Sequence, residues 1–80
     1  MTTKNAIKKL TSLGFKVEQD NRRYTVVKDH YILQFRQNGP TQEDNIVCIG
    51  IRHINDQSDS YTDYCAYTFF DNLSQAIRCL

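Results

Sequence analysis

Residues 46–54, which read Ile-Val-Cys-Ile-Gly-Ile-Arg-His-Ile, form the most apolar stretch of the chain. In an extended strand, alternate side chains face opposite sides. One face carries Val47, Ile49, Ile51 and His53, and the other carries Ile46, Cys48, Gly50, Arg52 and Ile54. A strand that is apolar on both faces is typical of the interior of a sheet. Gly50 in its middle predicts a bulge or the close approach of a packed group.

A helix is predicted at each end of the sequence. Over residues 3–13, one apolar stripe contains Ala6, Ile7, Leu10 and Leu13. Thr2 or Thr3 is the expected N-cap, and Gly14 is expected to end the helix. From about residue 72, a second stripe contains Leu73, Ala76, Ile77 and Leu80. Asn72 with Gln75 resembles a capping box, and Asp71 is an alternative cap.

Extended segments are predicted between the helices at residues 15–19, 22–28, 30–36 and 46–54, with residues 65–70 as a short strand or an irregular packed segment. Asp20-Asn21 is a turn signal, whereas Lys28-Asp29 is weaker and leaves open one long bent strand. The short connections require antiparallel pairing. We therefore predict a single α+β domain over residues 1–80, in which both helices cover one face of an antiparallel sheet of three to five strands.

The other sheet face is expected to stay partly open. Its predicted residues are Tyr24, Val26, His30, Ile32, Arg36, Cys48, Arg52 and Ile54. Nucleic-acid binding through this face is one hypothesis, with Tyr24, Arg36 and Arg52 contacting bases. Lys4, Lys8, Lys9 and the pair Arg22-Arg23 would then contact phosphates. Burial of two open faces in a homodimer is a further alternative.

Charge is divided unevenly along the chain, although the formal net charge is only +1. Residues 1–40 hold eight Lys and Arg against three Asp and Glu, and residues 41–80 hold two against six. Such asymmetry indicates either an interaction surface or two halves that neutralise each other. The near-zero total disfavours a strongly basic nucleic-acid binder and a wholly acidic mimic of DNA.

The three cysteines predict neither a disulfide framework nor a metal site. Their number is odd, and no secretory leader or membrane-spanning run is recognised, so a cytoplasmic setting is expected. The candidate ligands are His30, His53, Cys48, Cys65 and Cys79. They lack the paired spacing of zinc ligands, and small buried thiols are the expected role of the cysteines. No spacing favours Cys–His catalysis, so neither an enzyme nor a cofactor is predicted.

Residues 55–64 form an acidic loop rich in serine and tyrosine. The loop lacks the turn glycine and closing glutamate of an EF-hand, so calcium binding is not predicted. Aromatic residues bordered by charges are typical of protein interfaces. Phe69 and Phe70 are expected to be buried, and Arg52 is expected to hold the loop against the strand. The predicted partner-binding residues are Asp56, Asp59, Tyr61, Asp63 and Tyr64.

Residues 60–64 read Ser-Tyr-Thr-Asp-Tyr, and residues 69–77 read Phe-Phe-Asp-Asn-Leu-Ser-Gln-Ala-Ile. In the Thr-Asp-Tyr step and the Asn-Leu-x-x-Ala-Ile helix start, the chain resembles small domains of phage and plasmid large polyvalent proteins. The resemblance implies an accessory module that acts on host factors, and not an enzyme. The expected function is binding and inhibition or modulation of a host protein complex in the cytoplasm, in an anti-defence, anti-CRISPR-like role.

Overall fold

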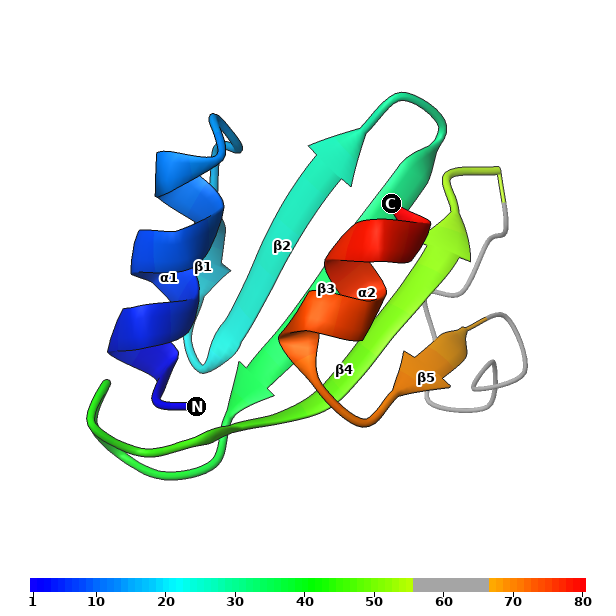
Figure 1. Ribbon diagram of the computed structural model, residues 1–80. Helices are drawn as coiled ribbons and strands as arrows, with labels where there is room; N and C mark the ends of the chain where they lie inside the picture. Colours follow the sequence, from blue (N-terminus) through cyan, green and yellow to red (C-terminus); the bar gives the residue numbers. More distant parts are fainter. Residues whose placement is uncertain (56–66) are drawn as a thin grey trace.

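The computed structural model describes residues 1–55 and 67–80. Its elements in chain order are α1 (Thr3–Ser12), β1 (Glu18–Asp20), β2 (Arg23–Lys28), β3 (Tyr31–Gln37), β4 (Ile46–His53), β5 (Thr68–Phe70) and α2 (Leu73–Cys79). The strands form one antiparallel sheet in the order β1-β2-β3-β4-β5. Both helices cover the same face of this sheet (Figure 1). The predicted α+β fold is confirmed.

Both helices begin where their local sequence predicts. The Thr2 side chain accepts a hydrogen bond from the Asn5 amide at 3.1 Å, and the Asn72 side chain accepts one from the Gln75 amide at 2.9 Å. Each bond satisfies an amide that has no partner within its helix. After α1, Gly14 adopts φ 90°, a conformation that costs glycine little. The short loop that follows turns the chain back toward the sheet.

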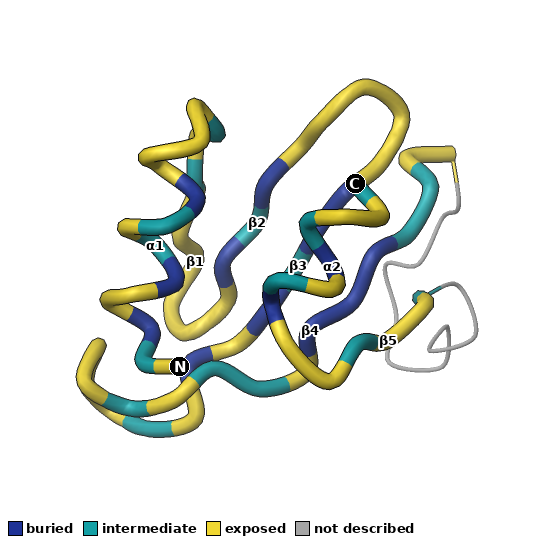
Figure 2. The backbone as a smooth tube through the Cα atoms, in the orientation of Figure 1, coloured by how far each residue is buried: buried dark blue, intermediate teal, exposed yellow. Residues whose placement is uncertain are grey.

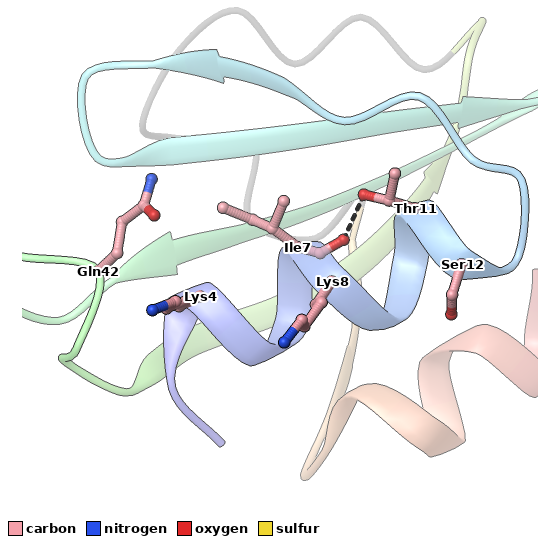
Figure 3. Close-up of a pocket in the computed structure, with 6 residues that line it drawn as sticks. All are labelled: Lys4, Ile7, Lys8, Thr11, Ser12 and Gln42. Atoms are coloured by element: carbon pink, nitrogen blue, oxygen red, sulfur yellow. Dashed lines mark hydrogen bonds between the residues drawn. The ribbon is translucent and has the colours of Figure 1, made fainter.

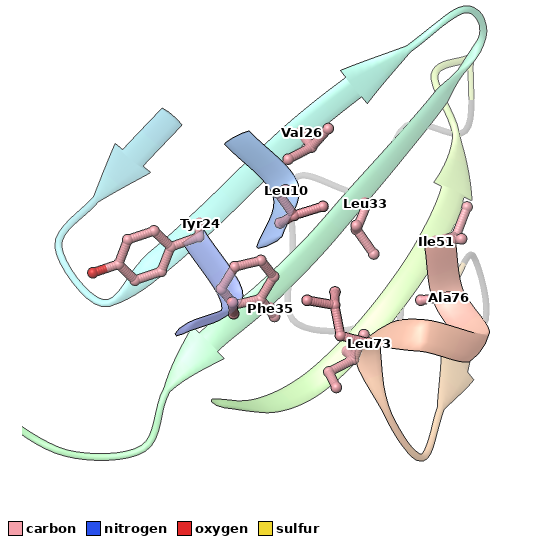
Figure 4. Close-up of a cluster of buried hydrophobic side chains, with 10 residues drawn as sticks. Leu10, Tyr24, Val26, Leu33, Phe35, Ile51, Leu73 and Ala76 are labelled. Atoms are coloured by element: carbon pink, nitrogen blue, oxygen red, sulfur yellow. The ribbon is translucent and has the colours of Figure 1, made fainter. Parts of the chain in front are cut away.

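The core lies between the sheet and the two helices (Figures 2 and 4). Its buried residues are Ala6, Leu10, Tyr24, Val26, Leu33, Phe35, Ile49, Ile51, Leu73 and Ala76. They come from both helices and from β2, β3 and β4, and the small side chains of Ala6 and Ala76 let the helices approach the strands. Lys9 Nζ donates a 2.6 Å hydrogen bond to Ser74 Oγ, which links α1 to α2.

A bulge at Cys48 changes which side chains of β4 face the core. Cys48 has φ 54°, and the pairing of β3 with β4 shifts between Gln34 and Arg36. Such an extra residue reverses the alternation of the strand beyond it. Ile46 therefore packs against the core with Ile49, while Val47 lies opposite Arg36 on the other face. The prediction that Val47 shares a face with Ile49 was wrong for this reason.

Tyr24 and Val26 lie in the core, so their predicted place on the open face was wrong. The pairing of β2 with β3 sets Tyr24 opposite Phe35 and Val26 opposite Leu33, which places both under the helices. The Tyr24 and Phe35 rings stack with centroids 5.3 Å apart. The buried Tyr24 hydroxyl lies 3.0 Å from Gln37 Oε1, to which it donates a hydrogen bond. Gln37 in turn donates to the Gly39 carbonyl at 2.7 Å.

Replacing Tyr24 by phenylalanine tests this buried contact. We expect Tyr24→Phe to lower the free energy of unfolding by about 1–3 kcal/mol, because it leaves the buried Gln37 oxygen without its donor. Urea denaturation followed by circular dichroism measures the loss. Gln19→Ala, at an exposed position of β1, is the matched control. Equal stability of Tyr24→Phe and the wild type would contradict a buried hydroxyl donor.

Candidate functional site

The sheet face opposite the helices is the candidate site, and we name it the open face. Side chains that alternate with the core residues of each strand define it. Its members are Glu18, Asp20, Arg23, Thr25, Val27, Ile32, Gln34, Arg36, Val47, Gly50, Arg52, Tyr67 and Phe69. Neither α1 nor α2 covers this face, since the buried residues of both helices pack on the other one. Of the residues predicted for it, Ile32, Arg36 and Arg52 are confirmed.

A chain of hydrogen bonds crosses the open face from β2 to the residue before β5. Arg52 Nε lies 3.1 Å from the Tyr67 hydroxyl oxygen, to which it donates, and the Tyr67 hydroxyl donates to Gln34 Oε1. Gln34 Nε2 then donates to Thr25 Oγ1 at 3.3 Å. The Arg52 guanidinium carbon also lies 5.8 Å from the centre of the Tyr67 ring. These contacts hold four polar side chains in one arrangement, so little rotamer freedom remains to be lost when a partner binds.

Two aromatic rings lie on the open face because Gly50 has no side chain. A Cβ atom at Gly50 would be 3.2 Å from atoms of both the Tyr67 and Phe69 rings. The two rings contact each other with centroids 5.8 Å apart. Phe69 is 49% exposed, whereas Phe70 is half-buried and packs against the core. The expectation that Phe69 is buried was therefore wrong, since the pairing of Phe69 with Gly50 turns it outward.

Arg23 and Arg36 form a pair of like charges on the open face. They are direct register partners on β2 and β3, and both are exposed. Asp20 is the neighbour of Arg23 on β1, yet no ion pair joins them. Among the described residues, the single ion pair within 4 Å joins Lys16 to Glu18 at 3.8 Å. The two guanidinium groups thus have no described carboxylate that neutralises them.

The lysines of α1 lie in the helix layer, whereas Arg23 and Arg36 lie on the other face of the sheet. Lys4 and Lys8 border a shallow hollow of about 460 Å³ along the outer side of α1, together with Ile7, Thr11, Ser12 and Gln42 (Figure 3). Lys9 is half-buried and bonded to Ser74. With Tyr24 also in the core, the residues predicted to bind nucleic acid do not form one surface.

The acidic-loop residues predicted to bind a partner lie outside the described part of the chain. They are Asp56, Asp59, Tyr61, Asp63 and Tyr64. Binding through them stays a prediction, as does the attachment of this loop by Arg52. Gln34 and Tyr67 had no predicted role. The alternation of residues 30–36 signalled that Gln34 lies on the face opposite to Leu33 and Phe35, but only the pairing of the strands brings it to Tyr67.

The candidate metal ligands are dispersed within the described residues. Cys48 and Cys79 are exposed free thiols, so the expectation of buried thiols was wrong for these two. The His30 and His53 rings stack with centroids 5.8 Å apart, and His53 Nδ1 accepts a hydrogen bond from the Asn55 amide at 3.2 Å. In residues 1–55 and 67–80, no three His, Cys, Asp or Glu side chains are grouped so as to hold a metal ion.

Fold and site together define a small α+β domain with one helix-covered sheet face and one face that exposes arginine and aromatic side chains. Comparison with known protein families, with curated proteins and with solved structures finds no match. Within residues 1–55 and 67–80, no helix is long and apolar enough to cross a membrane. The site must therefore be interpreted from its own residues.

Proposed function

We propose that this protein is a non-enzymatic accessory protein of a phage or mobile element, and that it binds and inhibits or modulates a host protein complex through its open face. The resemblance of residues 60–64 and 69–77 to modules of large polyvalent proteins supports the origin and the host target. The proposed setting is the host cytoplasm. The acidic loop at residues 55–64 is proposed as a second part of the contact.

One observation carries the choice of the open face. Phe69 is about half exposed and stands beside the hydrogen-bonded group of Tyr67, Arg52 and Gln34. Tyrosine, arginine and phenylalanine are enriched at protein interfaces, and a few such residues supply most of the binding energy. An aromatic side chain held by a rigid neighbour loses little entropy on binding. This arrangement supports binding better than catalysis.

A protein partner accounts for the charges better than a nucleic acid does. Strong nucleic-acid binding requires several cations along the path of the backbone phosphates. The open face has three arginines, and Glu18 and Asp20 on β1 lie at the same side of the sheet. Lys4 and Lys8 border a hollow beside α1 in the other layer. An interface with aromatic residues at its centre and a few charges around them fits this distribution.

Replacing Phe69 by alanine tests the proposal. We expect Phe69→Ala to reduce capture of the partner from host lysate at least about tenfold, a typical loss for a central aromatic contact. Affinity purification with quantitative mass spectrometry measures the captured proteins. The control is Leu13→Ala, because Leu13 is 54% exposed but lies at the end of α1.

Circular dichroism and urea denaturation of both variants show whether each is folded. A partner captured equally by wild type and by folded Phe69→Ala would contradict binding through the open face. Loss of capture in both variants would indicate contact through the helix layer and would contradict the proposal equally.

A further inference from the structure

Within the described residues, Arg23 and Arg36 are a pair of like charges on the open face that no ion pair neutralises. Arg23 and Arg36 are direct cross-strand partners, and side chains in that relation begin about 4.5–5.5 Å apart. Like charges placed directly opposite each other destabilise a sheet. No described carboxylate pairs with either residue. No hydrogen bond or ion pair of either side chain within the described residues offsets this cost.

Two adjacent guanidinium groups suit an anionic ligand. Each presents a planar fork of N–H donors that matches the two oxygens of a carboxylate, or those of a phosphate. A single anion placed between the forks accepts hydrogen bonds from both and removes their mutual repulsion. Since both side chains are exposed, an anion on a partner surface has access to them.

The surroundings of the pair favour a carboxylate on a protein over the phosphates of a nucleic acid. Val47 is the register partner of Arg36 on β4, and Asp20 is that of Arg23 on β1. The positive charge is therefore confined between an apolar residue and an acidic one. This placement accommodates one or two anionic groups, whereas a nucleic-acid strand brings a phosphate at every nucleotide.

We propose that Arg23 and Arg36 form a receptor for a glutamate or aspartate of the partner, which presents an acidic segment with apolar residues that reach Phe69. This inference rests on the proposed function, since it names the chemistry of the partner at the same face. The acidic side chain sits across β2 and β3. The apolar residues contact the aromatic rings two strands away, beside β5.

A binding titration with defined probes tests the receptor. The first probe is a fluorescein-labelled peptide in which glutamate alternates with leucine and phenylalanine, and its control has glutamine in place of glutamate. The second probe is labelled oligothymidylate. We expect the double variant Arg23→Glu/Arg36→Glu to weaken binding of the acidic peptide, measured by anisotropy, at least about tenfold. The glutamine peptide is expected to bind weakly to every variant.

The matched control is Lys4→Glu/Lys8→Glu, which changes the net charge equally but in the helix layer. It is expected to bind the acidic peptide within about twofold of the wild type, since surface charges more than a Debye length apart are largely screened. If both double variants lost the same affinity for the acidic peptide, the proposed receptor would be wrong, because non-specific electrostatic attraction would then explain the binding. Absence of peptide binding to wild type, or tighter arginine-dependent binding of oligothymidylate, would overturn it too.

The lysate capture separates this inference from the proposed function. The milder variant Arg23→Gln/Arg36→Gln removes both charges without introducing repulsion. If Phe69→Ala loses the captured partner while this variant keeps it, the open face binds the partner and the carboxylate receptor is wrong. If both folded variants keep the partner, the proposed function itself is wrong.

Discussion

Replacing Phe35 by alanine is expected to remove about 3–5 kcal/mol of stability. Phe35 is 0% exposed, lies in the centre of β3 and stacks on Tyr24. Its removal leaves a cavity between sheet and helices that neighbours fill only in part. A domain of this length has a total stability of roughly 4–12 kcal/mol, so the loss is a large fraction of the total.

Urea denaturation followed by far-ultraviolet circular dichroism measures the change. Val27→Ala is the control, because Val27 is 54% exposed on the neighbouring strand. The control is expected to lose no more than about 0.5 kcal/mol, as is usual for surface positions. Similar losses for Phe35→Ala and Val27→Ala would contradict the assignment of the helix-covered face as the core.

Replacing Gly50 by valine is expected to abolish partner binding while leaving the helix layer intact. The Cβ of any side chain at Gly50 would stand 3.2 Å from the Tyr67 and Phe69 rings, and the valine methyl groups would occupy the space of the rings themselves. Because the rings must move, Tyr67 loses its bonds to Gln34 and Arg52. Overpacking of this kind costs about 1–3 kcal/mol.

Gly50→Ala provides a graded control for this effect. It adds only the Cβ, to which the rings can adjust by a few tenths of an ångström. We expect the loss of partner capture and of stability to increase from alanine to valine. Valine favours strands, so backbone preference alone would make the variant more stable. Full capture by a folded Gly50→Val would show that the position of these rings is not needed for binding.

Local signals predicted the helices and most of the strands. A hydroxyl or amide before an apolar stripe identified the N-caps at Thr2 and Asn72, and Gly14 marked the end of α1. Those features depend on residues within one or two turns of each other, so they can be recognised in the chain. The close approach to Gly50 was also predicted, but the identity of the approaching groups was not.

Which side chains of β2 face the core depends on the pairing of β2 with the next strand, β3, and not on the pattern of β2 alone. Tyr24 and Val26 are apolar, but so is Val27 on the other side, and alternation alone does not decide which set is buried. The register with β3 decides it, by setting Tyr24 against Phe35. A shift of one residue would have reversed every side chain of the strand.

Gly50 indicated a bulge or a close approach in this strand, but no local signal placed the bulge at Cys48. Positive φ values are uncommon for residues other than glycine, asparagine and aspartate, and cysteine gives no indication of one. The same limit applies to the open face. Arg36 and Arg52 were predicted there from alternation, whereas the bonds of Tyr67 to Gln34 and Arg52 arise only after β4 and the residue before β5 come together.

The central claim is that the partner binds the open face of the sheet. Amide chemical-shift mapping on isotope-labelled protein tests it directly, with the protein captured from lysate as the added partner. The largest changes are expected at Arg23, Arg36, Gly50 and Phe69, with smaller ones in the first two turns of α1. Changes confined to α1 and α2, with β2–β5 unaffected, would contradict the claim.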